Sequence, residues 1–190
     1  DGKVTAEDQT VIGHGLPIHT GGFTNNFSYK GFDLSIFFQW SYGNDVINYN
    51  RAKLEDLRGQ HTNQLASAMN HWTPRVDNGD GTYTEGNYTN YLCAVNCNLT
   101  NLNTSRVVED ASFLRLKNVQ LGYNFPVKLI KRIGISSLRL YVSGQNLWTW
   151  TKYTGYDPEV STRNSALTRG FDYSAYPKTT SYTFGIKLGL

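Results

Sequence analysis

The chain has 190 residues with 18 lysines and arginines against 15 aspartates and glutamates, and its net charge of +3 does not indicate a nucleic-acid-binding surface. Aromatic residues make up 14% of the chain and glycine occurs 18 times, a composition that disfavours a helical bundle and favours strands joined by turns. No apolar run approaches the roughly 18 residues that a membrane-spanning helix needs.

The first residues, DGKVTAED, match the second half of a calcium loop of the D-x-[DN]-x-[DN]-G type. In that interpretation Asp1 and Asp8 are metal ligands, and Thr5 occupies a further ligand position. Half a loop supplies fewer oxygens than the roughly six to eight that calcium takes, so an acidic turn containing glycine is the alternative. Because the motif starts in mid-loop, we expect this chain to be a piece of a longer protein.

Residues 18–30 and 31–42 predict a hairpin with a tight turn at Lys30 and Gly31. Apolar side chains occupy every second position from Phe32 to Tyr42, and mostly polar residues lie between them. This alternation predicts strands with one apolar and one polar face. The second arm has about the 11 residues that a tilted strand needs to cross a bilayer.

No strand pattern persists through residues 43–110, which we interpret as a long loop. Cys93 and Cys97 lie in a polar, asparagine-rich part of this loop, with no histidine or further cysteine beside them for a zinc site. The spacing favours a small disulfide in an oxidising compartment, and free thiols are the alternative.

Three more strands are predicted at residues 111–125, 137–148 and 179–190, with a second long loop at residues 148–178. The last strand, TTSYTFGIKLGL, alternates to the final residue, and its apolar positions are Tyr182, Phe184, Ile186, Leu188 and Leu190. An open strand edge finds no hydrogen-bond partner in lipid, so a strand of this kind is typical of the closing position of a membrane barrel.

Short turns and long loops alternate along the chain, so all the short turns fall on one side of the sheet. Outer-membrane barrels have this asymmetry, with short periplasmic turns and long extracellular loops. Aromatic residues also gather at the strand ends, as in the two girdles of such barrels: Trp40, Tyr42, Trp148 and Trp150 at the outer side, Tyr29, Phe32, Tyr123 and Phe125 at the inner side. A secreted soluble β-domain that binds carbohydrate is the alternative from another class.

Five blocks of the chain resemble, in the same order, the carboxyl-terminal part of TonB-dependent outer-membrane transporters of the SusC/RagA type. They are DGKVTAEDQTVIG (1–13), YKGFDLSIFFQWSYGNDV (29–46), SFLRLKNVQLGYNFP (112–126), LRLYVSGQNLWTWTKYTGYDPEV (138–160) and YPKTTSYTFGIKLGL (176–190). The terminal Leu190 departs from the pattern, because barrels of this kind commonly end in an aromatic residue.

The resemblance implies an all-β fold: about five carboxyl-terminal strands of an antiparallel transmembrane β-barrel of 22 strands, with residues 43–110 and 148–178 as extracellular loops. It also implies a plug inside the barrel and a SusD-like surface lipoprotein that captures glycan or oligopeptide. TonB would act through an amino-terminal part that lies outside this chain. A SusC-like barrel that serves only as a structural or secretion-complex subunit is a further alternative.

Import needs no catalytic group, and the chain shows no nucleophile, paired carboxylates or metal-spaced histidines, so we predict no enzyme activity and no cofactor besides the calcium. The candidates for contact with ligand or lipoprotein are loop aromatics: Trp72, Trp148, Trp150, Tyr153 and Tyr156. An aromatic girdle or loop packing is the alternative, and it is the more common role for such residues. Arg139 and Lys187 are expected to face the polar interior of the barrel.

Overall fold

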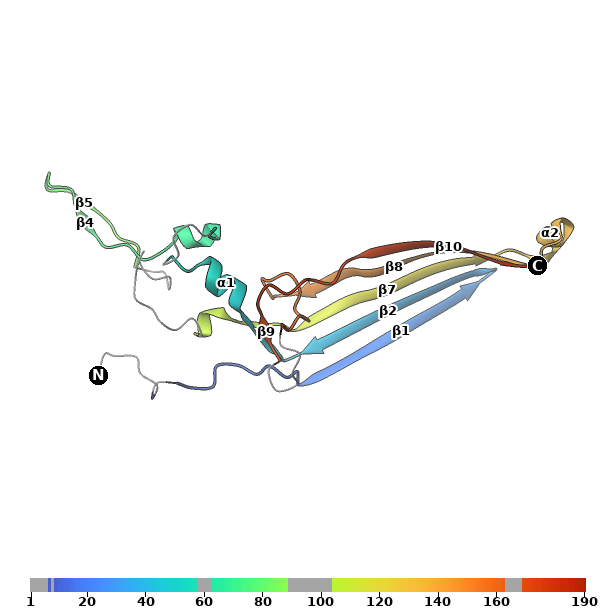
Figure 1. The fold of residues 1–190 in the computed structure, drawn as a ribbon, viewed down its shortest axis with the longest axis horizontal. Coiled ribbons are helices and arrows are strands. Elements are labelled where there is room, and N and C mark those ends of the chain that lie inside the picture. The colour runs from blue at the N-terminus through green and yellow to red at the C-terminus, as the bar shows by residue number, and fades with distance from the viewer. Residues whose placement is uncertain (1–6, 8, 58–62, 89–103, 163–168) are drawn as a thin grey trace. The chain divides into compact units, whose positions relative to one another are not determined.

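A computed structural model describes residues 7, 9–57, 63–88, 104–162 and 169–190 (Figure 1). The chain divides into two compact units. The first unit comprises Asp1–Gly15, Asp45–Glu109 and Val160–Ala175, and the second comprises Leu16–Asn44, Asp110–Glu159 and Tyr176–Leu190. No helix in the described ranges is long and apolar enough to span a bilayer.

The second unit is a single antiparallel sheet of five long strands. In spatial order these are β1 (His19–Tyr29), β2 (Phe32–Tyr42), β7 (Phe113–Asn124), β8 (Ser137–Thr151) and β10 (Ser181–Gly189). Figure 1 shows the five strands side by side, and every neighbouring pair is antiparallel. The predicted all-β, antiparallel fold is therefore confirmed, and each strand lies within three residues of the range expected from alternation.

Tight connections join the strands at one end of this sheet. The β1–β2 turn has Lys30 at φ 46° and Gly31 at φ 90°, the two positive angles of the turn that best fits a twisted hairpin. A Cβ at Gly31 would lie 2.8 Å from the carbonyl oxygen of Asn124, so glycine is required there for space as well. Between β7 and β8 the chain makes one helical turn, α2 (Val127–Ile130), followed by η4 (Lys131–Ile133).

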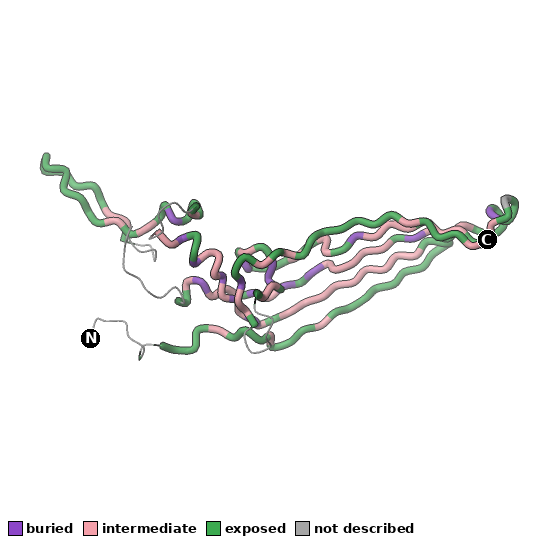
Figure 2. The backbone as a smooth tube through the Cα atoms, viewed as in Figure 1, coloured by how far each residue is buried: buried purple, intermediate pink, exposed green. Residues whose placement is uncertain are grey.

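The two faces of the sheet differ in chemistry. Residues that pair across the strands form rows of one kind. One row on the apolar face consists of Leu34, Leu121, Val142 and Phe184, and the next row, on the polar face, consists of Ser35, Gln120, Ser143 and Thr183. No second layer of this unit covers the apolar face: Phe184 is 81%, Ile186 70% and Leu188 57% exposed. Figure 2 shows the same strands as mostly exposed or intermediate rather than buried.

A β-bulge in β7 preserves the two faces. The pairing with β2 shifts between Phe37 and Phe38, so β7 carries one extra residue, Lys117. An extra residue reverses the alternation of faces along the strand. As a result Arg115 pairs opposite Gln39 on the polar face, whereas strict alternation from the far end of β7 would place it on the apolar face.

β8 also departs from regular pairing, at Asn146 and Leu147. These two residues lie between the pairs Asn118↔Gln145 and Leu116↔Trp148, and Asn146 has a φ of 50°. The strand resumes beyond them and ends at Thr151, three residues after the predicted end at residue 148. The predicted strand ended too early because Asn146 and Leu147 interrupt the alternation, which resumes at Trp148 and Trp150.

The first unit holds most of the region predicted as a loop at residues 43–110. A three-stranded sheet in the order β6-β3-β9 consists of β3 (Asp45–Asn48), β6 (Val108–Asp110) and β9 (Phe171–Asp172). The other elements are α1 (Tyr49–Leu54), η2 (Ala66–Met69), β4 (Val76–Asp77), β5 (Tyr83–Thr84) and η3 (Ser105–Val107). The strands have two to four residues, which is too short for alternation to be recognised in the sequence.

Buried charges as well as apolar side chains hold the first unit together. Glu55 is buried and accepts hydrogen bonds from Arg51 Nε at 3.2 Å, from Ser67 Oγ at 2.7 Å and from Arg106. Glu109 accepts from Arg51 Nη1 at 3.3 Å. The region is therefore a folded body with its own core, around Val46, Ala52 and Val107.

We predict that deleting Lys117 leaves the sheet able to assemble, as does Lys117→Ala. Without Lys117 the apolar positions Leu114 and Leu116 are in phase with Val119 and Leu121, so Arg115 stays on the polar face and no bulge is needed. The measurement is the fraction of full-length protein that shows the heat-modifiable electrophoretic mobility of a folded barrel. A folded fraction far below that of the alanine variant would show that the bulge does more than keep the two halves of β7 in phase.

Candidate functional site

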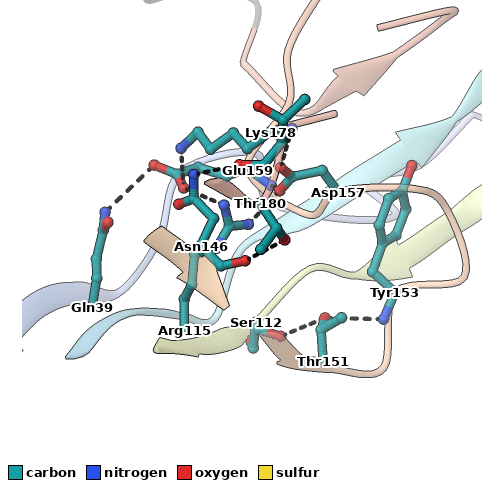
Figure 3. A network of polar contacts seen from close by, with 11 residues as sticks. Gln39, Ser112, Arg115, Asn146, Thr151, Tyr153, Asp157, Glu159, Lys178 and Thr180 are labelled. Carbon is teal, nitrogen blue, oxygen red and sulfur yellow. Dashed lines mark hydrogen bonds and ion pairs between the residues drawn. The ribbon is translucent and has the colours of Figure 1, made fainter. Parts of the chain in front are cut away.

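The strongest candidate site is a cluster of charged groups on the polar face, built around Arg115 (Figure 3). Arg115 is 2% exposed. Its Nη2 donates to Asp157 Oδ1 at 2.5 Å, and its Nη1 lies 3.6 Å from Glu159 Oε2. A buried guanidinium is tolerated only when it is paired and hydrogen-bonded, so these carboxylates are what allow Arg115 to lie against the sheet.

Asp157 joins three segments that are distant in the sequence. Besides Arg115 of β7, its Oδ1 accepts the backbone N–H of Glu159 at 3.0 Å, and its Oδ2 accepts the backbone N–H of Lys178 at 3.1 Å. Asp157 belongs to the connection that follows β8, and Lys178 lies just before β10. The carboxylate therefore holds both ends of the β8–β10 connection at Arg115 of β7.

These hydrogen bonds determine the charge state of Asp157. Burial alone would raise the pKa of its carboxyl group, but the hydrogen bonds from Arg115 and from the Glu159 and Lys178 N–H groups outweigh it, so the pKa is lowered from its ordinary value. Asp157 is therefore an anion at neutral pH, as the ion pair with Arg115 requires.

Glu159 is the more open carboxylate of the cluster. It forms an ion pair with Lys178 Nζ and accepts a hydrogen bond from Gln39 Nε2 at 3.4 Å. The side chains of Lys178 and Glu159 remain 36% and 29% exposed, in contrast to Arg115. The cluster therefore has a buried half, which holds the chain together, and a half that solvent reaches.

The bulge in β8 adds a second tie to the segment before β10. Asn146 Nδ2 donates to the carbonyl oxygen of Thr179 at 3.0 Å, and Thr180 Oγ1 donates to the carbonyl oxygen of Asn146 at 2.9 Å (Figure 3). The left-handed conformation of Asn146 is one that asparagine adopts more readily than most residues. The irregularity in β8 thus serves to hold the approach to the last strand.

The predicted contact aromatics lie in four different environments. Trp148 and Trp150 are on the apolar face, paired with Leu116 and Leu114, where an outer girdle would lie. Tyr153 is 5% exposed and its ring packs against Gly155, whereas Tyr156 is 83% exposed. Trp72 belongs to the first unit and contacts Tyr88 with 6.3 Å between ring centroids. Contact of these residues with a ligand stays a prediction.

Arg139 and Lys187 lie opposite each other on the polar face, as expected for residues that face a barrel interior. Arg139 forms an ion pair with Asp33 across Gly122, and a Cβ at Gly122 would lie 2.7 Å from the guanidinium. In the last strand, Tyr182, Phe184, Ile186 and Leu188 project from the apolar face, and Leu190 follows the strand. Their role in barrel assembly stays a prediction.

Two predicted sites lie outside the described residues. These are the disulfide of Cys93 and Cys97 and the calcium ligands Asp1 and Asp8. Within the described ranges no group of three or more histidines, cysteines or acidic residues is placed to hold a metal ion.

Arg115, Asp157 and Lys178 were not recognised as a site from the sequence. One signal was available: in SFLRLKNVQLGYNFP the apolar positions change phase where Lys117 and Asn118 stand next to each other. A phase change inside a strand indicates a bulge, and bulges often direct a side chain to a functional position. Asp157 lies 42 residues after Arg115, and Lys178 lies farther along the chain. No sequence pattern indicates that these two residues come close to Arg115.

Known proteins resemble this chain over nearly its whole length, although no family model matches it. TonB-dependent receptor P3 of Formosa agariphila is 36% identical over 99% of the chain, and TonB-dependent receptor P39 of the same organism is 34% identical over 96%. TonB-dependent receptor SusC of Bacteroides thetaiotaomicron is 34% identical over 43% of the chain. Among solved structures, the RagAB peptide importer in its closed-closed state covers 99% of the chain with a TM-score of 0.74 and 29% identity.

The chain spans less than a fifth of these relatives, namely 18% of P3, 17% of P39 and 19% of the RagAB chain. A single-layer sheet with one apolar, exposed face and one polar face, superimposable on part of RagAB, defines a segment of a membrane β-barrel wall. More particularly, the chain belongs to the TonB-dependent receptors of the SusC/RagA type.

We predict that Asp157→Ala loosens both ends of the β8–β10 connection. Removing one partner of a buried ion pair costs about 3–5 kcal/mol, so hydrogen exchange at the N–H groups of Glu159 and Lys178 should accelerate accordingly in the full-length protein. Asp77→Asn, at an exposed turn of the first unit, is the control. Unchanged exchange at both amides would show that Asp157 does not hold the connection.

The same amides should respond to acid. Because the pKa of Asp157 is lowered in the folded protein, its stabilising effect is complete above the ordinary aspartate pKa and is lost as the pH falls through the lowered value. Exchange at Lys178, corrected for its intrinsic pH dependence, should therefore accelerate only in that acidic range. The Asp157→Ala variant should lack this acid-dependent change.

Proposed function

We propose that this chain forms part of the outer-membrane barrel wall of a TonB-dependent importer, with its apolar face toward lipid and its polar face toward the lumen. The observation that carries the proposal is the exposure of Phe184, Ile186 and Leu188 on a sheet that no second layer of its unit covers. In water such a continuous apolar surface is unfavourable, whereas in a bilayer the hydrocarbon chains cover it.

The rows of aromatic residues support a membrane position. Tyr29, Phe32 and Tyr123 are neighbours across β1, β2 and β7 at the end with tight turns. At the other end, Leu114 of β7 lies between Trp40 of β2 and Trp150 of β8. Aromatic side chains at two levels of a membrane barrel usually form the girdles at the two membrane interfaces. The tight-turn end is then periplasmic and the β8–β10 connection extracellular.

The proposed cargo is an oligopeptide or a glycan that a SusD-like surface lipoprotein helps to capture. RagAB, to which the chain is similar, is described as a peptide importer, and SusC as a TonB-dependent receptor. TonB would act through a part of the protein outside this chain. Tyr156 is the best placed of the loop aromatics to touch cargo or lipoprotein, because it projects from a connection that Asp157 holds in place.

Import by the full-length protein is tested in cells. Uptake of labelled peptides and oligosaccharides should require both the receptor and a proton gradient, and should stop when an uncoupler is added. A barrel that inserts correctly but supports no gradient-dependent uptake of either class would instead favour the structural or secretion-complex role.

Membrane orientation of the faces is tested by one matched pair of variants in β10. Ile186→Arg places a charge on the apolar face and is expected to cost about 2–4 kcal/mol near the bilayer midplane. Thr183→Arg places the same charge on the polar face and should cost far less. The comparison uses urea unfolding of the full-length barrel in lipid vesicles, and equal destabilisation by both variants would refute the assignment of faces.

A further inference from the structure

The charges around Arg115 do not balance. Three cationic groups, Arg115, Lys117 and Lys178, interact with two carboxylates, Asp157 and Glu159. Lys117 reaches this group because the bulge in β7 inserts it between Arg115 and Asn118, and it interacts electrostatically with both Glu159 and Lys178. One positive charge is therefore in excess.

The buried carboxylate cannot compensate this excess. Asp157 uses Oδ1 for Arg115 and for the N–H of Glu159, and uses Oδ2 for the N–H of Lys178. Only Glu159 remains for the two ammonium groups, and it also receives Gln39 and lies near Arg115. Two ammonium groups close to one shared carboxylate leave an uncompensated attraction for an anion.

The excess charge lies where a solute can reach it. Lys178 and Glu159 form the solvent-exposed half of the cluster, and Lys117 is only partly buried, whereas Arg115 and Asp157 are enclosed. An anion arriving from the polar side therefore reaches Lys178 and Glu159, whereas Arg115 and Asp157 stay enclosed. A lysine ammonium is a compact charge with rotatable donors, suited to a carboxylate without a fixed approach.

We propose that Lys117 and Lys178 form a binding site for a carboxylate group of the imported ligand. This inference rests on the proposed function, because it requires the polar face to line the import path. The carboxylate would lie between the two ammonium groups and supply the missing negative charge. The site would thus favour acidic over neutral members of the cargo class.

The experiment measures binding to the purified full-length protein in detergent. The peptide probes are a glutamate-rich hexapeptide and its glutamine counterpart, and the glycan probes are trigalacturonate and maltotriose. We expect at least one acidic probe to bind about tenfold more tightly than its neutral counterpart at low salt, with the difference shrinking as salt screens the charges. The arm that shows the preference identifies the source of the carboxylate.

Lys117→Gln and Lys178→Gln should each abolish most of this preference while leaving binding of the neutral probe unchanged. The control is Lys152→Gln, because Lys152 is exposed and interacts with Asp110 instead of the Arg115 cluster. All three variants are first checked for the mobility of the folded barrel. Equal binding of acidic and neutral probes, no binding of any acidic probe, or an equal effect of Lys152→Gln overturns the site, while gradient-dependent uptake judges the import function separately.

Discussion

The structure depends on one constraint: each side of the sheet must keep its chemistry along the full length of every strand. A strand that is apolar on one side and polar on the other is fixed in register, because a shift by one residue exchanges the two sides completely. β7 meets this constraint only through its extra residue, since the apolar positions Leu114 and Leu116 are out of phase with Val119 and Leu121. The bulge is therefore required for β7 to keep one apolar and one polar face along its whole length.

The same extra residue determines the chemistry of the polar side. It places Arg115 on the polar face, where Asp157 and Glu159 neutralise it, and it adds Lys117 to the same group. The Arg115 cluster thus lies toward the end of the sheet from which the β8–β10 connection leaves. Farther along the strands the polar side is mostly uncharged, apart from Arg139, which Asp33 neutralises, and Lys187.

Alternation along the sequence was sufficient to predict the five long strands, because each has nine or more residues and one continuously apolar side. The short strands of the first unit could not be predicted, since two to four residues do not establish a period. The Arg115 cluster was missed because its partners come together only through the fold, and hydrogen bonds between distant segments leave no periodic trace.

The double attachment of Asp157, to Glu159 and Lys178, has a consequence for how such proteins diversify. With both ends of the connection closed at its base, the free energy of closing the intervening loop changes only slowly with its length. A change of length between Thr162 and Arg169, which leaves β9 and its pairing with β3 in place, is therefore expected to alter the pairing of β8 with β10 little. Homologous chains can thus differ in the length of this connection while they keep their last two strands paired.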